Sequence, residues 1–211
     1  MSSHVEPTGS TRTWLDKPAM PPKESLLTMH QAEGGRMVED EENVVTVFGS
    51  GDVRDGGAAY ATALATGGAL ARLGYTVANG GYGGAMEASA RGARAAGGRA
   101  IGVLCSLWKS PPNAYLDRTI TTGDVYARAR TLIELGRGGY VVLPGATGTL
   151  VEIALVWELM CKGFLPERPV VCVGAFWQPV IDMMSRARPG CGRLVAAVAA
   201  PDRLADHFAP V

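Results

Sequence analysis

The chain has 211 residues, of which 47% are hydrophobic, and its 20 basic residues balance its 20 acidic ones. This length and apolar content predict one globular domain with a sizeable core. Balanced charge without basic tracts argues against nucleic acid as a partner, and the chain has neither an apolar run of membrane-spanning length nor a signal-peptide core. We therefore expect a cytoplasmic protein that binds a small molecule, with no membrane contact.

Residues 1–43 are rich in Ser, Thr, Pro, Glu and Lys and show no sustained apolar period. We expect a polar N-terminal arm, mobile and without a role in chemistry. A short helix at 25–31 that packs on a partner subunit is the alternative.

From Val44 onward, short β-rich runs alternate with helical segments. The predicted strands are 44–48, 75–78, 100–104, 140–143 and 170–173, with a last edge strand at 194–198. The predicted helices are 58–73, 85–96, 125–135, 149–161, 179–186 and 202–208. This alternation predicts an α/β fold for 44–211, a single Rossmann-like domain with a doubly wound parallel sheet covered on both faces. Gly67, Gly68, Gly92 and Gly98 suit close packing of helices on that sheet.

Histidine and cysteine usage limits the possible chemistry. The three histidines are His4, His30 and His207, so the middle of the chain has none. This pattern argues against a Ser/His/Asp triad and against a histidine zinc site, and we expect no metal and no cofactor. The four cysteines lie far apart without a CxxC pair, which favours reduced, structural thiols. They are Cys105, Cys161, Cys172 and Cys191.

Three glycine loops follow predicted strands, at 49–52, 79–84 and 145–149. Ligands of open parallel sheets bind at the carboxyl ends of strands, and glycines let backbone amides approach an anion beside a helix N-terminus. Each loop alone is also explained by a tight strand-to-helix turn. The candidate phosphate- or nucleotide-binding residues are Gly49, Ser50, Gly80, Gly81, Gly83, Gly84, Gly145, Thr147, Gly148 and Thr149.

Two familiar nucleotide signatures do not match. The first loop reads GSGDVR, so Arg54 replaces the third glycine of a dinucleotide fingerprint, and the second strand ends at Asn79 rather than at an acidic residue. The GxxxxGK[ST] loop of nucleoside triphosphatases is also missing from the sequence.

The segment PGATGTLVE at 144–152 resembles the PGGxGTxxE signature of the LOG ("lonely guy") family, the lysine decarboxylase-like Rossmann proteins. NGGYGGAMEASARGARAAGGRAIGV at 79–103 resembles their second glycine loop and the helix after it. The similarity runs from Val44 to Trp177 in the same order. It implies a homodimer with its active site near the interface. It also implies cytokinin riboside 5′-monophosphate phosphoribohydrolase activity, which releases free base and ribose 5-phosphate.

By position, the resemblance makes the third loop the phosphate site and Glu152 the motif glutamate. It makes Arg128 the catalytic arginine, with Arg130 as the fallback. The chain departs from the family pattern at Ala146, which replaces a glycine, and at 137–139, which contain one extra residue.

The chemistry of these residues supports the same reading. Cleavage of an N-glycosidic bond develops positive charge on the ribose, which the Glu152 carboxylate would stabilise while orienting water. Arg128 would pair with it, and Glu87, beside the second loop, is a second candidate for contacting ribose or water. As alternatives, Thr149 and Glu152 form a capping box, Arg128 and Arg130 are solvated, and Glu87 is a cap. We interpret Met86, Trp157, Met160 and Phe164 as core or dimer-interface residues.

The leading hypothesis is metal-independent hydrolysis of the N-glycosidic bond of AMP or a modified-adenine ribotide. The main rival is a non-catalytic carrier of a nucleotide or of a phosphorylated pterin such as the molybdenum cofactor. A third possibility is cleavage of an unusual nucleotide in a specialised biosynthetic pathway.

Overall fold

The computed structural model describes residues 43–211. The predicted arm, apart from Asn43, lies outside the described residues.

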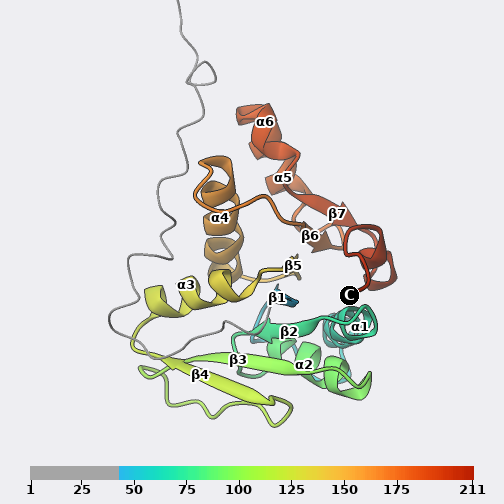
Figure 1. The fold of residues 1–211 in the computed structure, drawn as a ribbon, viewed down its shortest axis with the longest axis vertical. Helices are drawn as coiled ribbons and strands as arrows, with labels where there is room; N and C mark the ends of the chain where they lie inside the picture. The colour runs from blue at the N-terminus through green and yellow to red at the C-terminus, as the bar shows by residue number, and fades with distance from the viewer. Residues whose placement is uncertain (1–42) are drawn as a thin grey trace, which may run out of the picture. The chain divides into compact units, whose positions relative to one another are not determined.

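A seven-stranded parallel sheet forms the centre of the described region (Figure 1). Its strands are β1 (Val44–Phe48), β2 (Thr76–Asn79), β3 (Ala100–Cys105), β4 (Arg118–Thr122), β5 (Gly139–Val142), β6 (Val170–Val173) and β7 (Ala196–Val198). They lie in the order β4-β3-β2-β1-β5-β6-β7, and every neighbouring pair is parallel. The predicted α/β, Rossmann-like fold is confirmed.

The sequence analysis missed β4. This strand lies at the edge of the sheet, and Ile120 is its one buried residue. The strands that were predicted in the centre are buried along their whole length, so their sequences are mostly apolar. A polar edge strand carries no such signal.

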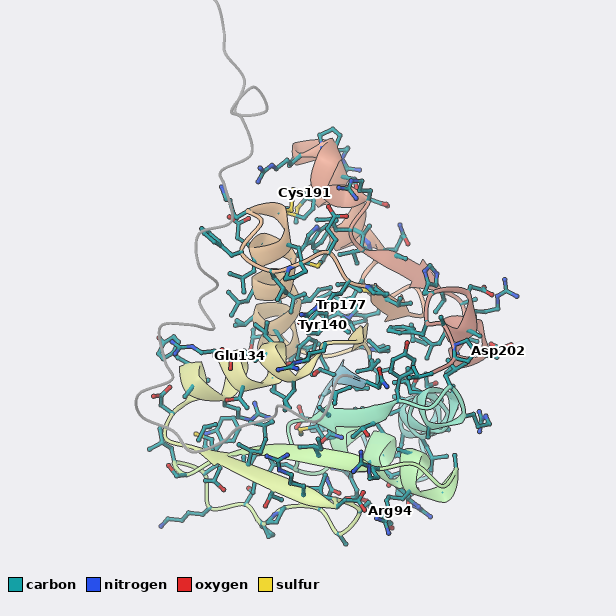
Figure 2. The ribbon with its side chains drawn as sticks, viewed as in Figure 1. Arg94, Glu134, Tyr140, Trp177, Cys191 and Asp202 are labelled. Atoms are coloured by element: carbon teal, nitrogen blue, oxygen red, sulfur yellow. A yellow bond between two sulfur atoms is a disulfide. The ribbon has the colours of Figure 1, made fainter. Side chains whose placement is uncertain are left out.

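Helices cover both faces of the sheet. On one face lie α1 (Ala58–Arg72), α2 (Ala85–Ala95) and the 3-10 helix η3 (Pro201–Asp206). On the other lie α3 (Val125–Leu135), α4 (Thr147–Cys161), α5 (Gln178–Ala187) and α6 (Pro189–Gly192). Strand β1 supplies both cores, because Val44 and Phe48 face the second set of helices while Val45 and Val47 face the first. Tyr140 and Trp177, labelled in Figure 2, are buried in the second core.

The glycines of α1 and α2 do not pack as predicted against the sheet. A Cβ at Gly67 would collide with the Ser89 carbonyl, and one at Gly92 would collide with the Leu64 carbonyl. These glycines therefore let α1 and α2 pack closely on each other, rather than on the sheet.

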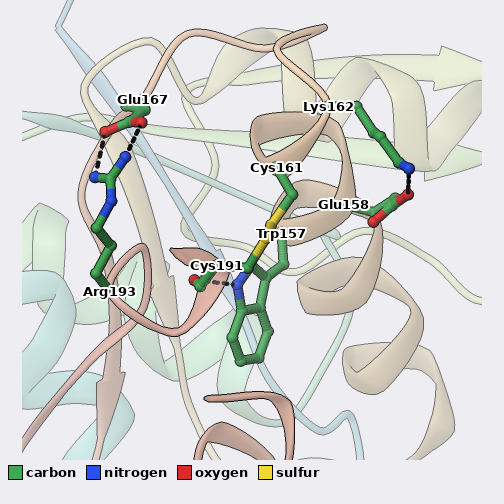
Figure 3. Close-up of a disulfide and its surroundings, with 7 residues drawn as sticks. All are labelled: Trp157, Glu158, Cys161, Lys162, Glu167, Cys191 and Arg193. Carbon is green, nitrogen blue, oxygen red and sulfur yellow. Dashed lines mark hydrogen bonds and ion pairs between the residues drawn. A yellow bond between two sulfur atoms is a disulfide. The ribbon is translucent and has the colours of Figure 1, made fainter. Parts of the chain in front are cut away.

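The prediction of four reduced thiols was wrong for one pair. Cys161 at the end of α4 and Cys191 in α6 form a disulfide, with their Cα atoms 5.7 Å apart (Figure 3). The Trp157 indole of α4 donates a hydrogen bond of 2.8 Å to the Cys191 carbonyl of α6, so it links the two helices beside the disulfide. The two residues are 30 positions apart, so their pairing depends on how α4 and α6 pack. Cys105 and Cys172 are free and buried.

No helix between residues 43 and 211 has the length and apolarity required to cross a membrane. The cytoplasmic location stays a prediction.

Candidate functional site

The three glycine loops meet at one edge of the sheet. Strands β2, β1 and β5 are neighbours, and the chain order reverses between β1 and β5, which is where open α/β sheets bind ligands. The Ser50 amide donates a hydrogen bond of 3.3 Å to the Pro144 carbonyl, and the Ala85 amide donates one of 2.9 Å to the Ser50 carbonyl. The first loop is thus hydrogen-bonded to the residue before the third loop and to the residue after the second. Gly81 and Gly84 have positive φ angles, so the path of the second loop requires glycine.

Helix α4 begins at Thr147, two residues earlier than predicted, with Ala146 as its N-cap. Ala146 has an ordinary extended conformation (φ −94°, ψ −153°) and no side chain caps the helix. The amides of its first turn therefore have no intrahelical partner and suit an anion. The capping-box interpretation was wrong, because Thr149 lies inside the helix rather than at its N-cap.

The side chain of Thr149 shapes the third loop from within. Thr149 is buried, and its hydroxyl and Cβ occupy the space that a Cβ at Gly145 would need. Thr147 and Gly148 are exposed at the mouth of the loop, and a Cβ at Gly148 would meet nothing within 4 Å. Thr149 and Gly145 thus give the loop its shape, while Thr147 and Gly148 are open to a ligand.

Arg128 reaches the site from α3, whose start is capped by Asp124 through a 2.8 Å bond from the Ala127 amide. Its Nε donates to the Val103 carbonyl of β3 at 2.8 Å, and its Nη2 donates to the Gly80 carbonyl at 3.1 Å. A Cβ at Gly80 would overlap the guanidinium. These contacts hold the buried Arg128 side chain in one orientation.

Two aromatic residues that the sequence analysis did not single out flank this arginine. The Arg128 Cζ lies 5.0 Å from the centroid of the Trp108 ring and 5.8 Å from that of Tyr82. Both distances fit cation–π contacts. Tyr82 lies within the second glycine loop and Trp108 three residues beyond β3, so their places after strand ends were the available signal.

Glu152 of α4 faces Arg128. Its Oε1 lies 3.8 Å from Arg128 Nη1, which is within ion-pair range but too long for a hydrogen bond. Burial raises the pKa of Glu152 to about 7, against the lowering influence of Arg128. Burial lowers the pKa of Arg128, which the Glu152 charge opposes. Because no hydrogen bond joins the two side chains, both keep hydrogen-bonding capacity for a ligand that lies beside them.

Activity that requires the Glu152 carboxylate should fall as the pH drops through about 7. Because burial raises the pKa of Glu152 to about 7, the charged form dominates only above that pH. For any reaction that uses this carboxylate, kcat/KM should fall on the acid side with an apparent pKa near 7. Initial rates between pH 5.5 and 8.5 check this. A flat profile over that range would contradict it.

The other predicted site residues are more peripheral. Arg130 is exposed on α3, two residues from Arg128. Glu87 accepts a 2.9 Å hydrogen bond from the Tyr60 hydroxyl, which ties α2 to α1. Gly83 borders open space, whereas Gly49 packs against Ala85 and Leu143. Within 43–211, no group of three or more His, Cys, Asp or Glu side chains is placed to hold a metal ion.

A family model described as the SLOG cluster4 family matches residues 42–186. The chain belongs to the SLOG cluster4 family. It is 33% identical over 116 residues to the cytokinin riboside 5′-monophosphate phosphoribohydrolase of Mycobacterium tuberculosis. That match covers 53% of this chain and 60% of the relative, so it shows distant homology over part of both proteins.

Two solved structures share the fold of this family member. The molybdenum cofactor binding protein of Rippkaea orientalis superposes with a TM-score of 0.65 and 22% identity, over 78% of this chain and 93% of that one. The molybdenum cofactor carrier protein of Chlamydomonas reinhardtii has a TM-score of 0.60 and 25% identity, over 75% and 91%. At 22% identity, the similarity to the Rippkaea protein shows only that the two proteins share a fold.

Proposed function

We propose that the protein hydrolyses the N-glycosidic bond of a nucleoside 5′-monophosphate, AMP or a modified-adenine ribotide, without a metal. The observation that carries this is the largely buried pair of Arg128 and Glu152 beside the third glycine loop. The distant homology to a phosphoribohydrolase supports the same reaction.

Each part of the site has a task in this reaction. The first-turn amides of α4, with the Thr147 hydroxyl, bind the 5′-phosphate. Water attacks C1′ of the ribose, and the bond from C1′ to the base nitrogen breaks with its electron pair going to the base. The water leaves its OH on C1′, and the proton it loses passes to the base. The Glu152 carboxylate stabilises the positive charge that develops on the ribose and orients the water. Arg128 orients Glu152 and offers its remaining N–H groups to the substrate.

The test is direct. The full chain is incubated with AMP and with isopentenyladenine ribotide, and free base and ribose 5-phosphate are measured by chromatography. Equal amounts of both products are expected. Absence of base release from every nucleoside monophosphate tested would overturn the proposal.

A carrier function is the second candidate. It is supported by the 25% identity to the Chlamydomonas molybdenum cofactor carrier and by Ala146, which places a methyl group in the anion loop. A carrier would bind a nucleotide or phosphorylated pterin tightly and return it unchanged after long incubation. Recovery of cleaved ligand would exclude this candidate.

We also propose that the protein forms a homodimer through α4. Leu150, Val151 and Leu155 are exposed large apolar residues on this helix, 41%, 59% and 37% accessible. Val151 and Leu155 are four residues apart and lie on one face of the helix, with Leu150 to one side. Exposed apolar side chains grouped on one helix typically bind another protein surface. Because the same helix carries Glu152, the dimer would bring the partner close to the site.

Val151→Glu should therefore give a monomer with reduced activity, because it places a charge in an apolar interface. Light scattering coupled to size-exclusion chromatography measures the mass. Met183→Glu on α5, a residue of similar exposure at 49%, is the matched control and should stay dimeric. A wild-type monomer at micromolar concentration would contradict the proposal.

A further inference from the structure

The loop after β3 exposes a tryptophan beside the proposed catalytic pair. Trp108 is 43% exposed, whereas Trp157 and Trp177 are buried and donate their indole N–H groups to carbonyls. Among residues 43–211, Trp108 is thus the tryptophan whose ring reaches solvent. Within the described part of the chain, the Trp108 indole donates no hydrogen bond, and the residue belongs to neither core.

Trp108 is nevertheless held in a defined position. Its amide donates a 3.1 Å hydrogen bond to the Cys105 carbonyl, which closes a turn at the end of β3. Its ring lies 5.5 Å from that of Tyr82 in a tilted arrangement. Tyr82 is fixed in turn, because its hydroxyl accepts a 2.9 Å hydrogen bond from the Cys105 amide. The two rings and the guanidinium of Arg128 form a preorganised wall.

Along the edge of the sheet, Trp108 and the third glycine loop are separated by about the length of a nucleotide. The third glycine loop follows β5, and β1 and β2 separate that strand from β3. Three strand intervals span about 14 Å, which is comparable with the length of an extended purine nucleoside monophosphate. Arg128 lies between the two ends, bonded to the carbonyls of Val103 and Gly80 and facing Glu152. A ligand with its phosphate at α4 and its glycosidic bond at Glu152 would extend its base toward Trp108.

We propose that the indole of Trp108 stacks on the base of a bound nucleoside monophosphate. This inference rests on the proposed function for the orientation of the ligand. Aromatic rings stack on the flat face of any nucleobase, and the exposed part of the indole offers such a surface. Trp108 is then a base-binding residue, separate from the groups that bind phosphate.

Binding of two ligands that differ only by the base tests this proposal. Dissociation constants for AMP and for ribose 5-phosphate are measured by calorimetry in the Glu152→Gln background, which prevents turnover. Trp108→Ala should weaken AMP binding about tenfold or more, while ribose 5-phosphate binding stays within about twofold. Trp108→Phe should keep most of the AMP affinity. Leu107→Ala, at the neighbouring exposed residue, is the matched control and should bind AMP normally.

Three results would overturn the stacking role. They are an unchanged AMP affinity in Trp108→Ala, equal weakening of both ligands, and failure of the parent protein to bind AMP. Equal weakening would mean that Trp108 only supports Arg128. AMP binding that depends on Trp108 in a wild-type protein that never releases base would instead refute the hydrolase proposal and leave the stacking role standing.

Discussion

Glu152→Gln should lower kcat for base release by about a thousandfold, the upper range for loss of one electrostatic stabiliser of a transition state. The amide keeps the size of the side chain but carries no negative charge to stabilise the ribose. Substrate binding should change little, since the phosphate contacts belong to the loop that precedes Glu152. Single-turnover rates and AMP dissociation constants separate these two effects.

The stability of this variant distinguishes lost chemistry from lost fold. Because burial raises the pKa of Glu152 to about 7, the native state binds more protons than the unfolded state between about pH 4.5 and 7. The wild-type protein therefore loses stability as the pH rises through that window. Glu152→Gln avoids that loss, so it should be at least as stable as wild type at pH 8. A fully active variant would remove Glu152 from the mechanism.

Arg128→Ala should be damaging to both activity and stability. The carbonyls of Val103 and Gly80 would each lose a donor in a buried environment, at a cost of about 1–3 kcal/mol for each group left unsatisfied. The charge facing Glu152 would also be lost. Thermal unfolding and base-release assays measure the two effects separately.

Arg130→Ala is the matched control, because Arg130 is an exposed arginine on the same helix. It should change the free energy of unfolding by less than about 0.5 kcal/mol and leave activity intact. Arg128→Lys keeps the charge but loses the planar fork, so it should fold better than the alanine variant without recovering full activity. If Arg130→Ala proved as inactive as Arg128→Ala, the assignment of Arg128 would be wrong.

Much of the fold was predictable from the chain because its central strands are buried on both faces. The run Val170–Val173 is continuously apolar, Thr46 alone interrupts the run Val44–Phe48, and glycines follow the helices between them. The edge strand Arg118–Thr122 was missed because its polar, exposed residues resemble a loop. A local sequence pattern predicts a strand well where burial on both faces requires apolar residues. It predicts an exposed edge strand poorly, because positions that face solvent accept many residue types.

The candidate site was also predictable only in part from the sequence. The glycine loops were recognisable in sequence, since parallel strands bring their carboxyl ends to one edge, and Glu152 and Arg128 followed from a motif resemblance. The partners of Arg128 were not recognisable. Val103, Gly80, Tyr82 and Trp108 come from other strands and loops and meet the guanidinium only through the packing of α3 on the sheet.

The sequence by itself thus determined the α/β class, the three loops and the acidic and basic residues available for chemistry, because these depend on local composition and spacing. Only the tertiary structure decided that Arg128 rather than Arg130 faces Glu152, that burial raises the pKa of this glutamate, and that Cys161 pairs with Cys191. Each of these depends on distances and burial between segments far apart in the chain, which no local pattern encodes.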